Sequence, residues 1–367
     1  MKAVFRVDAS LQIGTGHVMR CLTLACALSD LDVECHFICR NQPGNLAELI
    51  HNKGFPVHRL SSPEIGGGTN DKGCLPPLAH AAWLGASQEQ DALECTPIVR
   101  TLLPNWLIVD HYGIDIRWQT TLRPHYRKLM VIDDLADRMH QSDLLLDQNW
   151  FGEKTGIRYD DLVPQHTVKL LGPQYALLKP EYAQLRALMP PRDGIVRRLV
   201  VFLGGSDPDN QTAKVVRALM APDLVDLAAD IVIGVNHPDP SGIADLVAAR
   251  PNTNFHRNVP SLAGLMARAD LMVGAGGAAT WERMSLGLPS IVLSIASNQT
   301  PTNIALMEAG YIDFIGEMAN VTIADVAAAV RRAVSAPHGL KEQSAIMQQL
   351  VPATGLMALC RQLTALE

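Results

Sequence analysis

Short apolar runs alternate with amphipathic stretches along most of the chain. The first half contains five apolar runs of strand length, at residues 2–8, 33–39, 105–112, 128–134 and 143–149. The second half contains four more, RLVVFLGG, ADIVIGVN, ADLMVGAGG and PSIVLSI. Strands that alternate with helical segments predict parallel sheets covered by helices. We therefore expect an α/β protein made of two Rossmann-like halves in series.

A break in this alternation divides the chain. Between residues 171 and 194, LGPQYALLKPEYAQLRALMPPRDG introduces prolines and polar residues. The chain has 367 residues, and single hydrophobic cores stop growing at roughly 250 to 300. The pattern predicts four parts: an N-terminal domain (1–175), a linker (176–194), a C-terminal domain (195–345) and a C-terminal helix (346–367) that packs back across the domains. We expect the two parallel sheets to face each other across a cleft.

Charge and cysteine content exclude several classes of protein. A formal charge of −6 argues against a binder of nucleic acid or of anionic membranes, although a small anion can still be held locally. The seven cysteines form no C-x-x-C pair, so we expect reduced thiols and neither a disulfide framework nor a zinc site. Without an apolar run of about 20 residues, no membrane span is predicted. We expect a cytoplasmic monomer without a metal.

The first glycine turn lies in VDASLQIGTGHVMRC, between a strand and a helix. Such a unit is a common site for phosphates and nucleotides. The dinucleotide fingerprint G-x-G-x-x-G would need a third glycine at position 19, where the sequence has Met19. We therefore expect no nicotinamide or flavin, and no other cofactor.

His17 falls in the first turn of the helix that follows. The positive end of the helix dipole disfavours imidazolium there, so the ring should be neutral and able to accept a proton from water. The alternative is a helix-capping or core histidine. Arg20, one turn further, either orients a substrate or pairs with an acid on the helix surface.

Polar residues gather where the predicted strands of the first half end. Ligands of open α/β sheets bind beyond these carboxyl ends. The candidates are Asp8, His17, Asp110, His111, Tyr112, Asp133, Asp134 and Asn149. A single aspartate such as Asp133 or Asp134 more simply caps the next helix, whereas DHY directly follows a strand. The loop at 61–82 is expected at the same sheet edge, with an ordinary surface excursion as the alternative.

Two glycine turns mark the second half, FLGGSDPDNQ and VGAGGAATWERMSLGLP. Both run from a strand into a helix, so their backbone N–H groups can hold a diphosphate without metal. Glu282 lies a turn into the second helix, where its carboxylate can accept hydrogen bonds from ribose hydroxyls. Pairing with Arg283 in solvent is the alternative. Asn298 and Gln299 follow the next strand and face the same edge.

Six motifs, in order, resemble one family: FRVDASxxIGTGHVMRCLTLA, WLGASQEQDA, WLIVDHYGID, LGPQYALLKPEY, FLGGSDPDN and GAGGAATWERMSLGLPSIVLSIASNQ. These resemble the UDP-2,4-diacetamido-2,4,6-trideoxy-β-L-altropyranose hydrolases of bacterial pseudaminic acid synthesis, through nearly the whole chain. The last motif alone would indicate only the wider GT-B glycosyltransferase group. The resemblance implies a GT-B fold with two Rossmann-like domains.

The resemblance also implies an activity. The family hydrolyses its UDP-sugar substrate to UDP and free 2,4-diacetamido-2,4,6-trideoxy-L-altrose, in making the nonulosonate that decorates flagellin or surface polysaccharide. The family's proposed general base matches His17, which would activate water for C–O cleavage with inversion at the anomeric carbon. Family nucleotide contacts match Glu282 at the ribose and Asn298 near the diphosphate or sugar.

These arguments give one set of expected site residues. His17 is the catalytic residue. The expected substrate contacts are Asp8, Gly14, Gly16, Arg20, Asp110, Tyr112, Arg186, Asn298 and Gln299. The expected nucleotide contacts are Gly205, Ser206, Gly276, Gly277 and Glu282. Arg186 is included as a cation of the predicted linker, although a surface charge is the alternative.

Two other functions fit the same pattern. A GT-B glycosyltransferase would move the sugar to an acceptor other than water, and acceptor-dependent release of UDP would identify it. A noncatalytic UDP-sugar sensor would bind UDP without turnover, although the presence of His17 weighs against it.

Overall fold

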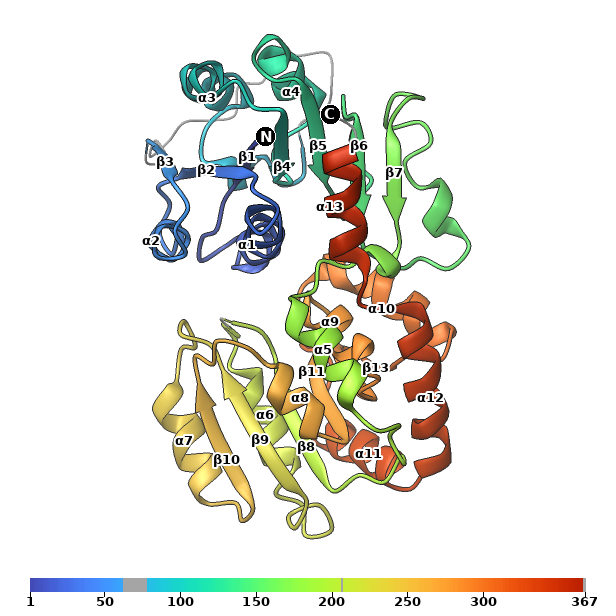
Figure 1. Cartoon of the computed structure of the whole chain (residues 1–367). Coiled ribbons are helices and arrows are strands. Elements are labelled where there is room, and N and C mark those ends of the chain that lie inside the picture. Colours follow the sequence, from blue (N-terminus) through green and yellow to red (C-terminus); the bar gives the residue numbers. More distant parts are fainter. Residues whose placement is uncertain (62–77, 206, 366–367) are drawn as a thin grey trace. The chain divides into compact units, whose positions relative to one another are not determined.

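The computed structural model describes residues 1–61, 78–205 and 207–365 (Figure 1). The chain divides into two compact units. The first unit comprises Met1–Asn149, Glu153–Leu177 and Thr354–Glu367, and the second comprises Trp150–Gly152 and Leu178–Ala353. Each unit holds one parallel sheet, so the α/β class and the two Rossmann-like halves are confirmed.

The sheet of the first unit has seven parallel strands in the order β3-β2-β1-β4-β5-β6-β7. Their bounds are β1 Lys2–Val7, β2 Glu34–Arg40, β3 Val57–Leu60, β4 Trp106–Asp110, β5 Lys128–Ile132, β6 Leu144–Asp147 and β7 Val168–Leu171. The strand order reverses between β1 and β4. In open α/β sheets the ligand site lies at such a switch point, beyond the carboxyl ends of the strands.

Five α-helices and four short 3₁₀ helices accompany the described part of this sheet. The α-helices are α1 Gly16–Ser29, α2 Ala47–Asn52, α3 Gln88–Leu102, α4 Ile116–Leu122 and α13 Gly355–Ala365. The 3₁₀ helices are η1 Ala81–Leu84, η2 Arg123–His125, η3 Lys154–Ile157 and η4 Pro173–Tyr175. Helix α13 packs beside α1, and the Trp106 indole on β4 donates to the Leu363 carbonyl at 2.9 Å.

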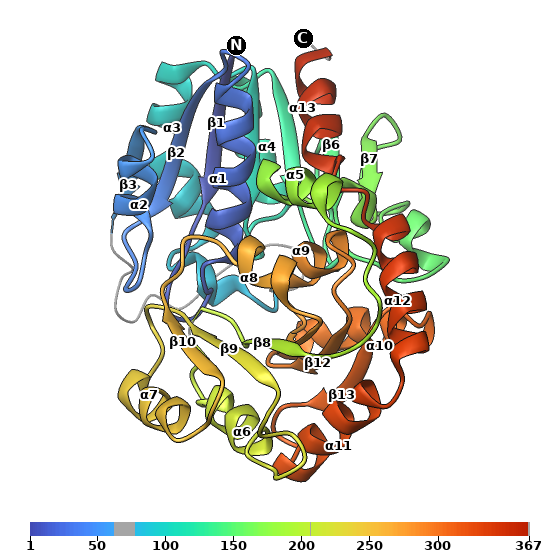
Figure 2. The same ribbon diagram turned by 60° about the horizontal axis from the view of Figure 1, so that its bottom comes forward.

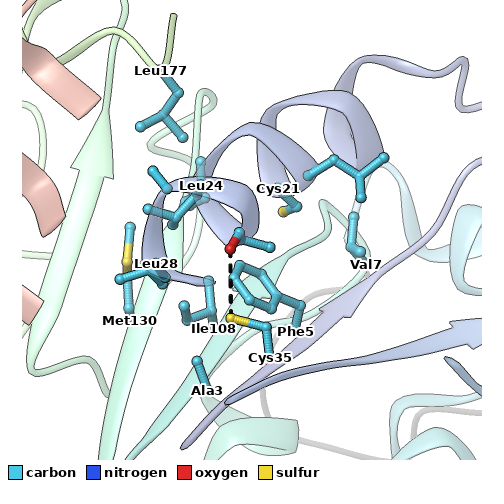
Figure 3. Close-up of a cluster of buried hydrophobic side chains, with 14 of the residues drawn as sticks. Ala3, Phe5, Val7, Cys21, Leu24, Leu28, Cys35, Ile108, Met130 and Leu177 are labelled. Carbon is cyan, nitrogen blue, oxygen red and sulfur yellow. Dashed lines mark hydrogen bonds between the residues drawn. The ribbon is translucent and has the colours of Figure 1, made fainter. Parts of the chain in front are cut away.

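Helix α1 is fixed by an apolar core. Figure 3 shows Leu24 and Leu28 of this helix above Phe5 and Ile108 of the sheet, all buried. The Cys35 thiol donates a long hydrogen bond of 3.8 Å to the Ala25 carbonyl of the helix. Burial of apolar side chains on this scale stabilises a helix far more than its intrinsic propensity does. The N-terminus of α1 is therefore held in place at the switch point.

The sheet of the second unit has six parallel strands in the order β10-β9-β8-β11-β12-β13, with its switch point between β8 and β11. The strands are β8 Arg198–Phe202, β9 Ala228–Ile233, β10 Thr253–Arg257, β11 Leu271–Ala275, β12 Ser290–Ser294 and β13 Asp313–Glu317.

Helices surround this second sheet as well. They are α5 Pro180–Leu188, α6 Gln211–Ala218, α7 Pro240–Ala248, α8 Ala263–Arg268, α9 Ala279–Ser285, η5 Ser297–Gln299, α10 Thr300–Glu308, α11 Ile323–Val334 and α12 Pro337–Leu350. Figure 2 shows α6 between α7 and α11, and both neighbours contact it. The described helices include none long and apolar enough to cross a membrane.

The segments between and after the sheets differ in detail from the sequence expectation. The expected linker contains helix α5, which packs on α8 and α9 of the second unit. The expected helix at 346–367 is two helices: α12 ends at Leu350, and α13 starts at Gly355 in the first unit. Gly355 allows this arrangement, because a Cβ there would lie 2.4 Å from the Tyr175 carbonyl carbon.

Candidate active site

A histidine and an aspartate meet at the switch point of the first sheet. His17 is the second residue of α1, and Asp110 is the last residue of β4, the strand beside β1. The His17 Nδ1 lies 2.6 Å from Asp110 Oδ1. A carboxylate at this distance requires the proton on Nδ1, which leaves the lone pair on Nε2. In the described parts of the chain we find no hydrogen-bond partner for Nε2.

Asp110 is ionised despite being buried. Burial by itself would raise the pKa of Asp110, but the charge of Arg20 and the hydrogen bonds from Arg20 and His17 outweigh it and hold this pKa well below its ordinary value. Arg20 donates twice to Asp110, from Nε at 2.6 Å and from a terminal nitrogen at 2.7 Å. Such a two-point contact fixes the plane of the carboxylate. Arg20 thus pairs with an acid, but inside the protein and not on the helix surface.

Asp134 joins three other side chains of the site. It accepts from Arg20 at 2.7 Å, from the Tyr112 hydroxyl at 2.6 Å and from the Asn149 amide at 2.9 Å. The Tyr112 ring meets the His17 ring edge-on, with centroids 4.6 Å apart. The simpler expectation, that Asp134 caps a helix, is wrong, because no helix follows β5 directly. Asp134 instead fixes the side chains of Arg20 and Tyr112, which lie beside His17.

The two glycines of the first turn have open space around them. Gly14 has a φ of +79°, in the left-handed region that side chains disfavour, and its N–H donates to the Ser10 carbonyl at 2.9 Å. Gly16 begins α1. An added Cβ would meet no atom within 4 Å at either glycine. Both remain candidates for substrate contact.

Asp8, the residue after β1, lies inside the protein. Its side chain is fully buried, 2.8 Å from Arg6, and accepts from the Arg40 backbone N–H at 2.7 Å. His111 lies on its other side, at 3.4 Å. Asp91 continues the network by accepting from both arginines. We therefore no longer expect Asp8 to contact substrate, since its carboxylate holds the ends of β1 and β2.

Asp133 and Asp147 form a further buried group beside the site. Asp133 pairs with Arg138 at 2.7 Å and accepts from the Tyr159 hydroxyl at 2.9 Å. Asp147, at the end of β6, contacts Arg158 and Tyr159. Burial and the charge of Asp134 raise the pKa of Asp147, while Arg158 opposes them. Neither aspartate caps a helix.

The glycine turn after β11 lies at the switch point of the second sheet. The Gly276 N–H donates to the Leu293 carbonyl at 3.2 Å, and a Cβ there would lie 2.1 Å from the Asn303 amide nitrogen. Gly276 is thus needed for close packing. Within the described chain the Gly277 N–H has no hydrogen-bond partner, so it remains a candidate phosphate contact. Asn303, which the sequence analysis missed, also donates to Ser294 at 2.9 Å.

Glu282 on α9 interacts with a residue from the expected linker. The Tyr182 hydroxyl of α5 hydrogen-bonds to it. Burial raises the pKa of Glu282 to about 6, against the opposing effects of Tyr182 and Lys179. Arg283 donates instead to the Ala275 carbonyl at 2.8 Å and to Thr280 at 2.9 Å. The partner of Glu282 is therefore Tyr182 and not Arg283. Tyr182 is a further residue of this site, and in the sequence only the KPEY part of the motif LGPQYALLKPEY could have indicated it.

The remaining candidates of the second unit differ in their surroundings. Asn298 is exposed on η5, and the Gln299 side chain accepts from the Ile295 N–H at 3.1 Å. A Cβ on Gly277 would lie 3.6 Å from Gln299, so these two residues are neighbours. Gly205 follows β8, while Ser206 lies outside the described residues, as does most of the 61–82 loop.

Arg186 has a structural role. Its guanidinium donates to the carbonyls of Ser285 at 3.3 Å, Val351 at 2.5 Å and Gln348 at 2.7 Å. These carbonyls belong to the C-terminal ends of α9 and α12, where cations stabilise unpaired acceptors. We therefore no longer expect Arg186 to contact substrate. No group of three or more His, Cys, Asp or Glu side chains in the described ranges is arranged to hold a metal.

Comparison with solved structures defines the fold of this pair of units. MurG of Acinetobacter baumannii superposes with a TM-score of 0.65 and 12% identity, covering 99% of both chains. UDP-GlcNAc 2-epimerase of Neisseria meningitidis, bound to UDP-GlcNAc, gives a TM-score of 0.62 and 12% identity over the full length of both. The chain has the GT-B fold, as the sequence motifs indicated.

No family model matches the chain. Curated proteins with similar sequences give more specific information than the fold does. The chain is 24% identical to the UDP-2,4-diacetamido-2,4,6-trideoxy-β-L-altropyranose hydrolase of Campylobacter jejuni over 314 residues, 85% of this chain and 98% of that protein. It is 32% identical to the spore coat polysaccharide biosynthesis protein SpsG of Bacillus subtilis over 132 residues, 36% of this chain and 39% of SpsG. These similarities confirm the resemblance that the motifs indicated.

A third curated relative is an uncharacterized protein. The uncharacterized protein MJ1062 of Methanocaldococcus jannaschii is 23% identical over 299 residues, 80% of this chain. The aligned part spans 55% of MJ1062, so the chain covers about half the length of that relative.

Proposed function

We propose that this protein hydrolyses UDP-2,4-diacetamido-2,4,6-trideoxy-β-L-altropyranose to UDP and 2,4-diacetamido-2,4,6-trideoxy-L-altrose. The observation that carries the proposal is the His17–Asp110 pair, at 2.6 Å, with Nε2 of His17 left without a partner among the described residues. Similarity to the Campylobacter hydrolase over 85% of the chain supports this substrate.

The arrangement around His17 fits a base that activates water. Nε2 accepts a proton from water while the water oxygen forms a bond to the anomeric carbon. The bond between that carbon and the phosphate oxygen breaks, and UDP leaves with the electron pair. Asp110 stabilises the imidazolium formed at His17, and Arg20 keeps Asp110 ionised. Attack from the face opposite UDP inverts the anomeric configuration, through an oxocarbenium-like transition state.

The second unit offers the groups that this reaction needs for the nucleotide. The amide of Gly277 would donate to the diphosphate, with Gly205, Asn298 and Gln299 as further contacts. Amides that point at the phosphate stabilise the negative charge that develops on UDP as it leaves. Glu282 would accept hydrogen bonds from the ribose hydroxyls. We propose that no metal is required.

Transfer to another acceptor is the second candidate function. MurG and the calicheamicin glycosyltransferase CalG4 share this fold, CalG4 with a TM-score of 0.63 over 99% of this chain. A transferase would hold the same nucleotide but deliver the sugar to a hydroxyl or amine in place of water.

The test is UDP release from the altrose nucleotide, its gluco-configured precursor and UDP-GlcNAc, each with and without a chelator. We expect rapid release from the altrose nucleotide alone, unchanged by the chelator. Release that begins only when an acceptor is added would establish the transferase and reject the hydrolase.

A further inference from the structure

Tyr112 lies at the centre of a group of aromatic rings. Its centroid is 4.6 Å from His17, 5.4 Å from His80 and 5.6 Å from Trp83. The Trp83 and Tyr112 rings are stacked within 25° of parallel, and His80 meets Trp83 edge-on at 4.6 Å. We call His80, Trp83 and Tyr112 the aromatic wall. It stands directly beside the proposed base.

Backbone contacts hold the aromatic wall at the carboxyl edge of the sheet. The Gln42 side chain, just after β2, donates to the Trp83 carbonyl at 2.8 Å. A Cβ on Gly113, just after β4, would lie 3.2 Å from the His80 carbonyl, so the two segments approach closely. Gly85 ends η1 with a φ of +68°. These contacts fix Trp83 at the same edge as His17.

Trp83 is more exposed than the other two tryptophans of the first unit. Trp106 and Trp118 of the same unit are 1% exposed, whereas Trp83 is only partly buried. A tryptophan that packs one face on Tyr112 and is partly open to solvent has aromatic surface left for a ligand. Flat apolar rings suit the C–H faces of sugars, because both surfaces lose water on contact.

We propose that Trp83 is a sugar-contact residue, whose indole packs against the apolar side of the hexose, including its C6 methyl group. The proposal rests on the proposed function, since the sugar must be the one attached to UDP. It places the anomeric carbon near His17 and favours 6-deoxy hexoses over sugars with a C6 hydroxyl. Burial lowers the pKa of His80, so this ring adds no positive charge of its own to the aromatic wall.

The test separates sugar binding from turnover. Affinities for UDP and for the UDP-linked 2,4-diacetamido-altrose are measured by calorimetry on the full chain carrying His17→Asn, which prevents consumption of the nucleotide sugar. The ratio of the two affinities isolates the contribution of the sugar. Trp83→Leu removes the ring, Trp83→Phe retains a smaller one, and Trp150→Leu is the control. Trp150 is also partly buried, but it packs on Tyr311 at 5.9 Å.

We expect Trp83→Leu to lower the affinity ratio about 10-fold, with Trp83→Phe recovering most of it. Affinity for UDP itself should be unchanged, which also shows that the variant is folded, and Trp150→Leu should keep the ratio. An unchanged ratio in Trp83→Leu, or an equal fall in Trp150→Leu, would overturn the proposal.

Failure of the hydrolase is distinguishable from failure of the sugar contact. If the wild type releases no UDP but Trp83→Leu lowers the ratio, the hydrolase fails and the sugar contact stands. If the wild type hydrolyses the nucleotide and the ratio does not respond to Trp83→Leu, only the sugar contact fails. If the sugar adds no affinity beyond UDP in any variant, the sugar contact is rejected.

Discussion

The two units place their candidate sites at equivalent switch points but build them differently. In the first unit, buried ion pairs surround the strand ends: Asp110 with Arg20, and Asp8 and Asp91 with Arg6 and Arg40. In the second, the corresponding edge has glycine turns, the Asn303 amide and the carboxylate of Glu282.

This difference fits two tasks. A base that moves a proton needs its partners fixed in charge and orientation before the substrate arrives, and paired buried charges achieve this. A diphosphate needs amides and close approach, which glycine turns provide. The following predictions test this division, from the largest expected effect to the smallest.

Removing the proposed base should have the largest effect. His17→Asn should lower kcat for UDP release about 10²- to 10⁴-fold, because water then lacks a proton acceptor. The variant should fold and bind UDP normally. His51→Asn, an exposed histidine of α2 in the same unit, serves as the control and should turn over normally. Wild-type turnover by His17→Asn would remove this residue from the base role.

Breaking the buried charge network should reduce stability in the first unit. Asp91→Ala leaves Arg6 and Arg40 without a shared partner, and the loss of one member of a buried ion pair costs about 3 to 5 kcal/mol of unfolding free energy. Urea denaturation measures this loss. Asp223→Ala, which breaks an exposed pair with Arg331 in the second unit, should leave the midpoint where it was. Equal midpoints for both variants would contradict the comparison.

The glycine turn of the second unit should tolerate substitution unevenly. Gly276→Ala places a Cβ 2.1 Å from Asn303, and overpacking of this kind costs about 1 to 3 kcal/mol. Gly277→Ala meets Gln299 only at 3.6 Å, so its stability should be nearly that of the wild type. Its affinity for UDP should fall, since the added methyl obstructs the approach of phosphate. Thermal melting and UDP titration of both variants would show whether the two effects separate in this way.

Glu282 should oppose stability at neutral pH. Its folded pKa of about 6 lies above its ordinary value, so folding favours the protonated form. The cost of ionisation is absent below the unfolded pKa and complete above the folded one. Glu282→Gln should therefore stabilise the protein by about 1 to 2 kcal/mol at pH 7 and by almost nothing at pH 4. Exposed Glu308→Gln is the control, and a gain that is the same at both pH values would reject this cause.

Strand position explains which parts of the fold the sequence could predict. The nine apolar runs correspond to the interior strands of the two sheets, which are buried on both faces. The four strands without a prediction, β3, β7, β10 and β13, are the four sheet edges. Edge segments such as VHRL and TNFHR are partly exposed and carry polar residues, so no continuous apolar run marks them.

The sequence predicts which side chains lie at the strand ends of the site, but it does not predict the side chains that hydrogen-bond to them. His17, Arg20, Asp110 and Tyr112 were expected there because they follow strands or begin a helix. Their partners come from distant segments: Arg20 and Asp134 are 114 residues apart, and Arg186 and Val351 are 165 apart. Local patterns carry no information about such pairs. Asp8 and Arg186 were therefore assigned to substrate although they serve the fold.

The central claim is that water, activated at His17, attacks the anomeric carbon. Hydrolysis of the altrose nucleotide in water enriched in ¹⁸O, followed by mass spectrometry of both products, tests it directly. The account predicts ¹⁸O in the free sugar and none in UDP, since the bond from the anomeric carbon to oxygen breaks. Heavy oxygen in the phosphate of UDP would show attack at phosphorus and contradict the account.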